Sequence, residues 1–297
     1  ASHLDSPSFW AGLVRLRDEY GIEGPQLVTF MKDGVASRLD SASFWDGLVR
    51  LRDGYGIEGP QLVTFMCGSV APRLDSPSFW DGLARLRDGY GIEGPQLVTF
   101  MSNGVASGLD SPSFGAGLVR LREEYGIEGP PLVKFMCNGV ASGLDSATFW
   151  AGLVRLREEY GIEGPQLVTF MKDGVASRLD SPSFWDGLTR LREEYGIEGP
   201  QLVKFMSNGV AYRLDSATFW DGLVRLREEY GIEGPALVKF MCGGVASRLD
   251  SATFWAGLTR LRDEYGIEGP QLVKFMCGGV ASRLDGEFAT TLGQIVC

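Results

Sequence analysis

A unit of 35 residues recurs eight times along this chain with few changes, and the repeats open at the leucines of positions 4, 39, 74, 109, 144, 179, 214 and 249. A unit this short cannot cover its own apolar face, so consecutive units must stack, and periods of about 20–50 residues are typical of solenoids. The repeats occupy residues 1–283. Residues 284–297 form either a divergent partial ninth repeat or a C-terminal cap.

Within each repeat the sequence predicts two helices of unequal length. Ser6 before Pro7 suits a helix start, and Gly21 suits a left-handed stop after a helix of residues 7–20. A shorter, mostly apolar helix is expected from Pro25 to residues 32–33, where a glycine follows. Residues 35–39 are then expected to begin the next long helix. The predicted fold is all-α: an α-solenoid, or superhelix, of eight helical hairpins.

Composition narrows the possible functions. The net charge of −10 argues against the usual basic surface for nucleic acids, because phosphate neutralisation supplies most of such affinity. The sequence shows no membrane span and no targeting signal. Four cysteines share one repeat position, and neighbouring copies should lie about 8–10 Å apart, too far for a disulfide. We expect free thiols, a soluble protein in a reducing intracellular compartment, with the nucleus as one option, and no metal site.

The aromatic row and the charged face of the long helix favour packing over chemistry. Trp10 recurs in every repeat except the fourth, which carries Gly115, so we expect inter-repeat packing and a local cavity beside that glycine. Arg15 and Arg17 are expected to pair with nearby acidic residues on a solvated face. His3 is the sole histidine, and no residues form a unique catalytic constellation. We therefore expect no enzyme activity, no cofactor and no small-molecule substrate.

The repeats differ most at two adjacent positions in the loop at the end of the short helix. The first position holds Lys32, Cys67, Ser102, Cys137, Lys172, Ser207, Cys242 and Cys277. The second position holds only Asp, Gly or Asn: Asp33, Gly68, Asn103, Asn138, Asp173, Asn208, Gly243 and Gly278. The Ser-Asn pair occurs in two repeats that differ at other positions, so the pair varies independently of the rest of its repeat.

This layout resembles the repeats of transcription activator-like effectors (TALEs), helical hairpins of similar length whose variable pair precedes a glycine. Lys32-Asp33-Gly34, followed by Leu39-Asp40-Ser41, carries the resemblance, and it recurs through nearly the whole chain. The resemblance implies that the array binds double-stranded DNA, one base per repeat. It implies that the second member of each pair reads the base and that the first member supports the loop. Val35, Ala36 and Ser37 depart from the family pattern near the phosphates, and Ser69 replaces the glycine in the second repeat.

The chemistry of the second position agrees with base reading. Aspartate accepts a hydrogen bond from cytosine, glycine leaves room for the thymine methyl group, and asparagine engages a purine N7. The expected order is C, T, G/A, G/A, C, G/A, T, T. The candidates for phosphate contact are Gly34, Arg38, Arg73, Arg178, Arg213, Arg248 and Arg283, with Gly108 and Gly143 replacing the arginine in two repeats.

Three other interpretations stay open. Asp, Gly and Asn before glycine are also favoured in tight turns, so the variation could be drift at a permissive turn. The loops or the concave surface could instead bind a protein, which would make the array a scaffold. Pentatricopeptide repeats, which bind single-stranded RNA, share the period and a junction like Gly21-Ile22-Glu23-Gly24-Pro25, but they do not select bases with a loop pair.

Overall fold

The computed structural model describes residues 6–32, 34–67, 70–102, 104–172, 174–206, 209–241 and 244–277. These residues form sixteen α-helices and seven 3-10 helices, and no strand occurs among them. Each repeat contributes one long and one short α-helix. The chain is therefore an α-solenoid, as the sequence predicts.

The long helices have identical lengths because their ends carry the same signals in each repeat. Ser6 caps α1 by accepting a hydrogen bond from the Phe9 amide at 3.4 Å. Gly21 ends α1 with a φ of 64°, and its amide donates to the carbonyl of Arg17. The long helices are α1 Pro7–Tyr20, α3 Ala42–Tyr55, α5 Pro77–Tyr90, α7 Pro112–Tyr125, α9 Ala147–Tyr160, α11 Pro182–Tyr195, α13 Ala217–Tyr230 and α15 Ala252–Tyr265.

The short helices end earlier than the sequence predicts. They are α2 Gly24–Phe30, α4 Gly59–Met66, α6 Gly94–Met101, α8 Gly129–Met136, α10 Gly164–Phe170, α12 Gly199–Met206, α14 Gly234–Met241 and α16 Gly269–Met276. The prediction that the first of them reaches residues 32–33 was wrong. The Lys32 amide donates to Thr29, three residues back, so the chain has already left the α-helical path before the variable pair.

A second correction concerns residues 35–39, which do not begin the long helix. They belong to separate 3-10 helices: η1 Val35–Arg38, η2 Ala71–Arg73, η3 Val105–Ser107, η4 Val140–Gly143, η5 Val175–Arg178, η6 Val210–Tyr212 and η7 Val245–Arg248. The Ser41 amide donates to Arg38, and Ser41 then caps α3 with an extended backbone. An N-cap residue has non-helical backbone angles, so the two helices cannot be continuous.

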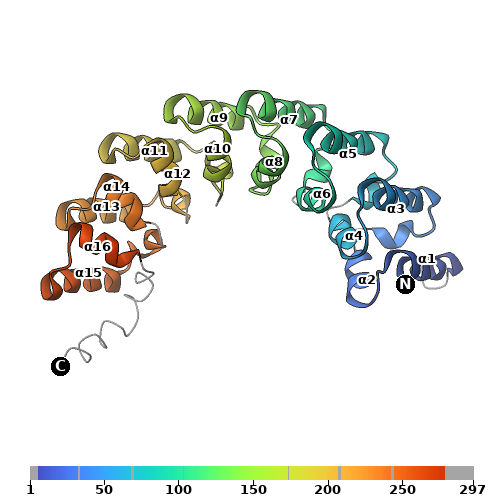
Figure 1. Ribbon diagram of the computed structural model, residues 1–297, viewed down its shortest axis with the longest axis horizontal. Coiled ribbons are helices and arrows are strands. Elements are labelled where there is room, and N and C mark those ends of the chain that lie inside the picture. The colour runs from blue at the N-terminus through green and yellow to red at the C-terminus, as the bar shows by residue number, and fades with distance from the viewer. Residues whose placement is uncertain are drawn as a thin grey trace. The chain divides into compact units, whose positions relative to one another are not determined.

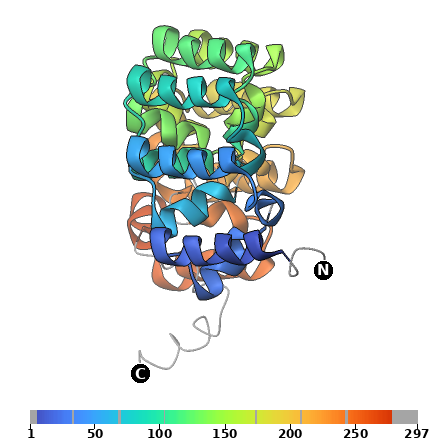
Figure 2. The same cartoon turned by 90° about the vertical axis from the view of Figure 1, so that its right-hand side faces the viewer.

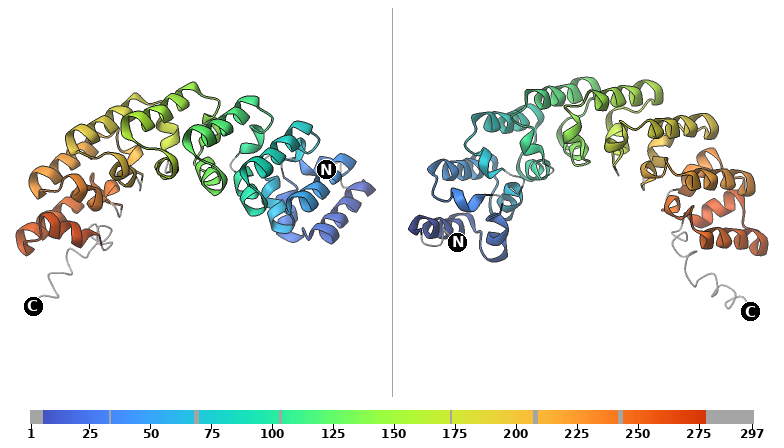
Figure 3. Two further views of the ribbon diagram at one scale, coloured as in Figure 1. Left: turned by 45° about the horizontal axis from the view of Figure 1, so that its top comes forward. Right: turned by 180° about the vertical axis from the view of Figure 1, so that it is seen from behind.

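The chain divides into two compact units, Ala1–Ser146 and Ala147–Cys297, each with four repeats. Within each unit the long helices form one layer and the short helices form a second (Figures 1 and 3). In the first unit α1, α3 and α5 stack side by side in the same orientation (Figure 2). Consecutive short helices also pack together, from α2 through α8 and from α10 through α16.

A glycine at the middle of each long helix lets the next repeat approach closely. A Cβ built on Gly12 would lie 3.0 Å from the Cβ of Leu39 and 3.3 Å from the Trp45 ring. Trp45 is buried, and its indole N–H donates to the Leu39 carbonyl at 2.8 Å. Arg15 lies 4.5 Å from the Trp45 ring centroid, which adds a cation–π contact. The structure thus confirms packing between repeats for five of the tryptophans, whereas Trp10 of the first repeat is exposed: the buried ones are Trp45, Trp80, Trp185, Trp220 and Trp255.

The buried tyrosine at each of these interfaces meets a position that varies between Val, Ala and Thr. Tyr160 shares a hydrogen bond with Thr189 of the next repeat, at 3.2 Å between the two hydroxyl oxygens. At the first interface Val49 of the second repeat stands at the equivalent position, and the buried Tyr20 hydroxyl has no hydrogen-bond partner within the described residues. Desolvation raises the pKa of Tyr20.

The fourth repeat departs from this pattern. Where the tryptophan ring would stand, the guanidinium of Arg85 approaches, and a Cβ built on Gly115 would lie 2.5 Å from its Nη1 atom. The hollow in this region lies instead beside Gly108, with a volume of about 320 Å³. An arginine of the preceding repeat thus reaches into the space of the missing indole, and the hollow beside Gly108 does not include Gly115 in its lining.

Candidate functional site

The variable pair lies at the turn between a short helix and the following 3-10 helix. Before the pair, Phe30 is buried; after it, Gly34 adopts a φ of 85° and Val35 is fully buried. This framework recurs, with a left-handed glycine also at Gly104, Gly139, Gly174, Gly209 and Gly244. Buried residues on both sides of the pair therefore hold the described ends of the turn in place.

The first members of the pair are mostly exposed. Lys32, Cys67, Ser102, Lys172 and Cys277 are exposed, and Cys137 is half-buried. Cys67, Cys137 and Cys277 are free thiols, as the sequence predicts for them. The remaining first members, Ser207 and Cys242, lie outside the described residues.

Of the second members, the described residues include Asn138. Its side-chain amide donates to the Lys134 carbonyl at 2.9 Å, which closes the end of α8. The hydroxyl of Ser102 makes a similar bond to the Thr99 carbonyl at 2.9 Å. Both bonds fix a loop side chain against its own helix. The other predicted base-reading residues, Asp33, Gly68, Asn103, Asp173, Asn208, Gly243 and Gly278, lie outside the described residues.

Within each unit the loops lie next to one another. In the first unit η1 packs against η2. In the second unit the thiol of Cys277 lies 3.7 Å from the Lys239 carbonyl at the end of the preceding short helix. The Tyr212 ring lies over Gly174 of the preceding loop, where it would collide with any added side chain. The loops of neighbouring repeats therefore form a row along one edge of each unit.

The arginines predicted to contact phosphates are engaged within the protein. Arg38 pairs with Asp75, Arg73 with Asp110, Arg178 with Asp215 and Arg213 with Asp250, each across an interface between repeats. The Arg213–Asp250 pair measures 3.1 Å. The Ser43 hydroxyl and then Arg38 lower the pKa of Asp75. Among the other candidates, Gly34 is exposed and Arg248 is half-buried, whereas Arg283 lies outside the described residues.

Lysines supply the cations that the sequence-based prediction overlooked. All six lysines of the chain lie in a short helix or its loop, and none lies in a long helix: Lys32, Lys134, Lys172, Lys204, Lys239 and Lys274. Each is exposed, and none is ion-paired with a described residue. The segments from the proline of each short helix to residue 34 or its equivalent contain these six lysines and only two acidic residues, Asp33 and Asp173. This edge therefore carries net positive charge, whereas the whole chain carries −10.

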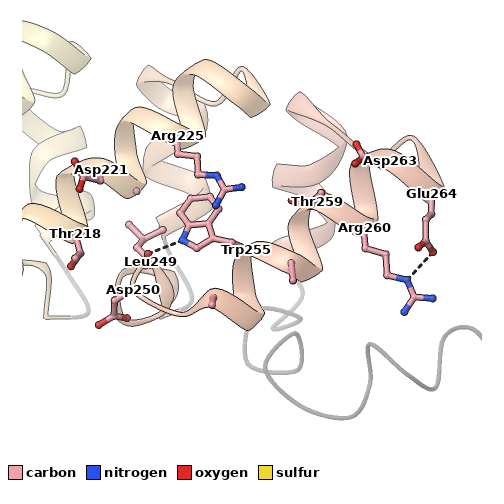
Figure 4. A pocket seen from close by; sticks show the side chains of 13 residues that line it. Thr218, Asp221, Arg225, Leu249, Asp250, Trp255, Thr259, Arg260, Asp263 and Glu264 are labelled. Atoms are coloured by element: carbon pink, nitrogen blue, oxygen red, sulfur yellow. Dashed lines mark hydrogen bonds and ion pairs between the residues drawn. The ribbon is translucent and has the colours of Figure 1, made fainter.

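The charged residues of the long helices largely pair with one another. Arg15 pairs with Glu19 and Arg17 with Asp18, as expected. Between α13 and α15 lies a groove of about 820 Å³ whose rim includes Asp221, Asp250 and Asp263 (Figure 4). Its arginines are occupied: Arg225 lies over the Trp255 ring and Arg260 binds Glu264. A groove lined in this way would repel phosphate.

The fold defines the class of protein: a helical-repeat solenoid whose variation is concentrated at its loops. No protein-family model matches the chain, and no curated protein matches it either. No helix among the described residues combines the length and the apolar character needed to cross a bilayer. The described part of the chain also contains no group of three or more His, Cys, Asp or Glu side chains placed to hold a metal ion.

Proposed function

We propose that the array binds double-stranded DNA along its short-helix edge, with one base read by each variable pair. The observation that carries this proposal is the contrast between a nearly constant, buried framework and a variable pair whose described first members are mostly exposed. The TALE-like layout, in which the second residue is Asp, Gly or Asn, supports the same function. A protein in this role would work in a reducing compartment such as the nucleus, where its free thiols persist.

The charge on the short-helix edge supports contact with the DNA backbone. Lys134, Lys204, Lys239 and Lys274 lie on the exposed side of the short helices, just before the loops. Because Arg38, Arg73, Arg178 and Arg213 are held in ion pairs, the lysines are the better candidates for phosphate contact. Each lysine that neutralises a phosphate releases a condensed counterion, so the affinity should fall as the salt concentration rises.

The first experiment compares a duplex that contains the order C, T, G/A, G/A, C, G/A, T, T with a scrambled duplex, across a salt series. Tighter binding to the ordered duplex is expected. An Asp33→Asn, Asp173→Asn variant should shift the preference from cytosine to a purine at two positions and leave thermal stability nearly unchanged. Equal, negligible binding to both duplexes at low salt would refute the proposal.

The lysines provide a matched pair of variants, because Thr and Lys exchange naturally at this position. The variant K134T/K204T/K239T/K274T should bind more weakly, with a salt dependence reduced by about 0.9 per lysine on a double-logarithmic plot. The converse variant T29K/T64K/T99K should bind more tightly. Both variants install residues that other repeats already carry, so their folding should be preserved. Unchanged affinity in both would exclude this edge as the DNA-binding surface.

Protein binding is the second candidate, and the carboxylates around the groove between α13 and α15 are the observation that favours it. The rim of the groove between α13 and α15 combines carboxylates with the edge of a buried tryptophan, which suits a basic protein surface. A scaffold of this kind would bind its partner without regard to the order of the variable pairs. Exchanging two loop pairs would then leave binding unchanged, whereas it would alter the preferred DNA sequence of a base-reading array.

A further inference from the structure

We infer that the hollow beside Gly108 is a binding site for a guanidinium group, presented by an arginine side chain of a partner protein. The hollow has a volume of about 320 Å³ and is lined by residues that include Gly108, Ser111, Phe114, Ser142 and Asp145. This volume lies at the lower end of the range of about 300–1,000 Å³ that is usual for ligand pockets. All of its lining residues belong to the first unit.

The neighbouring interfaces show what such a pocket holds. An arginine in one repeat binds the aspartate 37 residues further along the chain: Arg38 binds Asp75 and Arg73 binds Asp110. By the same spacing, position 108 faces Asp145, but this repeat has glycine in place of the arginine. The protein thus contains the acceptor half of an arginine–aspartate pair without its own donor.

The carboxylate of Asp145 is hydrogen-bonded to a serine in the same way as the carboxylate of Asp110. Asp110 accepts a hydrogen bond from the Ser78 hydroxyl at 2.8 Å in addition to its bond with Arg73. Asp145 likewise accepts a hydrogen bond from the Ser113 hydroxyl, and no described residue forms an ion pair with it. A carboxylate oriented by a hydroxyl and open on its other side suits a guanidinium, whose planar set of donors matches carboxylate geometry.

The pocket wall explains why a ligand from outside is needed. Phe114 lies against Gly108, and a Cβ built on the glycine would lie 2.6 Å from the Phe114 ring. The backbone of this repeat therefore has no room for a side chain of its own at position 108, whereas the hollow beside Asp145 remains. A flat guanidinium entering between the Phe114 ring and the carboxylate would have an aromatic wall on one side and its charge partner on the other. DNA is excluded as the ligand because its phosphates would meet Asp145.

The test uses N-acetyl-arginine amide as the probe and the full chain as the receptor, with binding followed by saturation-transfer NMR. Asp145→Asn should weaken binding about tenfold, the effect of losing one charge-assisted hydrogen-bond acceptor. Asp110→Asn changes the net charge equally but leaves this pocket intact, so it should bind the probe like the unmodified chain. Arg73→Gly, which copies the natural glycine, should create a second site at Asp110.

Each possible outcome either supports or overturns the inference. Loss of binding in Asp145→Asn alone, together with a second site in Arg73→Gly, supports the inference. Equal binding by the two Asp→Asn variants would show that the probe associates through overall charge and would overturn it. The inference also fails if millimolar probe does not bind the unmodified chain, or if N-acetyl-lysine amide binds as tightly as the arginine probe. None of these outcomes depends on whether the array binds DNA.

Discussion

Replacing the central glycine of a long helix by alanine should destabilise the array, although alanine is the better helix former. Gly47 is buried in the middle of α3. A Cβ at this position would lie 3.0 Å from the Cβ of Leu74 and 3.2 Å from its Cδ1 atom. Leu74 is only 3% exposed, so it has little room to retreat. The glycine is therefore required for the close approach of consecutive repeats.

The change in unfolding free energy for Gly47→Ala follows from two opposing effects. Alanine in a helix interior gains about 0.5–1 kcal/mol over glycine because it loses less backbone entropy. Overpacking a buried contact typically costs about 1–3 kcal/mol. The Gly47→Ala variant should therefore lose roughly 0–2.5 kcal/mol of unfolding free energy. Helix propensity alone predicts the opposite sign.

The same helix supplies a matched control in Gly54. This glycine is exposed, and a Cβ there would meet nothing closer than the Cγ atom of Arg50 at 4.0 Å. Other repeats carry glutamate at this position, as at Glu19. Gly54→Ala should therefore stabilise the chain by about 0.5–1 kcal/mol. The two variants make the same chemical change in one helix and should shift stability in opposite directions.

Urea unfolding followed by circular dichroism would give the two changes in midpoint. Stability in repeat arrays is distributed over units and their interfaces, so hydrogen exchange in α3 and α5 should be measured as well. Faster exchange in both helices is expected for Gly47→Ala but not for Gly54→Ala. Equal stabilisation by both alanines would refute the role assigned to the central glycine.

Four further predictions test the interfaces. Val49→Thr should bring a hydroxyl to the buried Tyr20 and raise stability by about 0.5–1.5 kcal/mol in urea unfolding, as long as the threonine adopts the geometry seen in other repeats. Burial raises the pKa of Tyr20 above its usual value of about 10, so the stability it contributes is present below pH 10 and should fall as a pH titration proceeds above it. Trp80→Ala should cost about 3–5 kcal/mol by opening a cavity, and thermal unfolding would show this loss. Asp110→Asn breaks the pair with Arg73 and should cost no more than about 1 kcal/mol, less at high salt, because both side chains are more than a quarter exposed.

The sequence predicts the parts of this fold that depend on local signals. Ser6, Pro7 and Gly21 mark the ends of α1 correctly, because capping depends on residues within one helical turn. The burial of most of the tryptophans also follows from their position in the repeat. The 3-10 helix does not, since residues 35–38 carry no signal that distinguishes a short 3-10 segment from the first turn of an α-helix.

The candidate site was harder to predict because its electrostatics depend on contacts between repeats. Arg38 was expected to be available for phosphate, but it binds Asp75, 37 residues further along the chain. The sequence alone cannot reveal which aspartate Arg38 meets. The lysines were overlooked for a different reason. Their exchange with threonine looks like neutral surface variation until the structure places them all on the edge that carries the loops.

Arginines held in contacts within the protein and lysines that are exposed differ in their availability for phosphate, and this difference changes what DNA binding would require. Arginines on the long helices and beside the loops hold repeats together, so they cannot also neutralise phosphates without weakening the interfaces. The six lysines remain, and if all of them met phosphates the double-logarithmic salt slope would be about −5. A much steeper slope would mean that interface arginines leave their aspartates on binding. In that case Asp110→Asn, which frees Arg73, should bind DNA more tightly than the unmodified chain. A slope near −5 would instead leave Asp110→Asn with only the small gain expected from removing one negative charge.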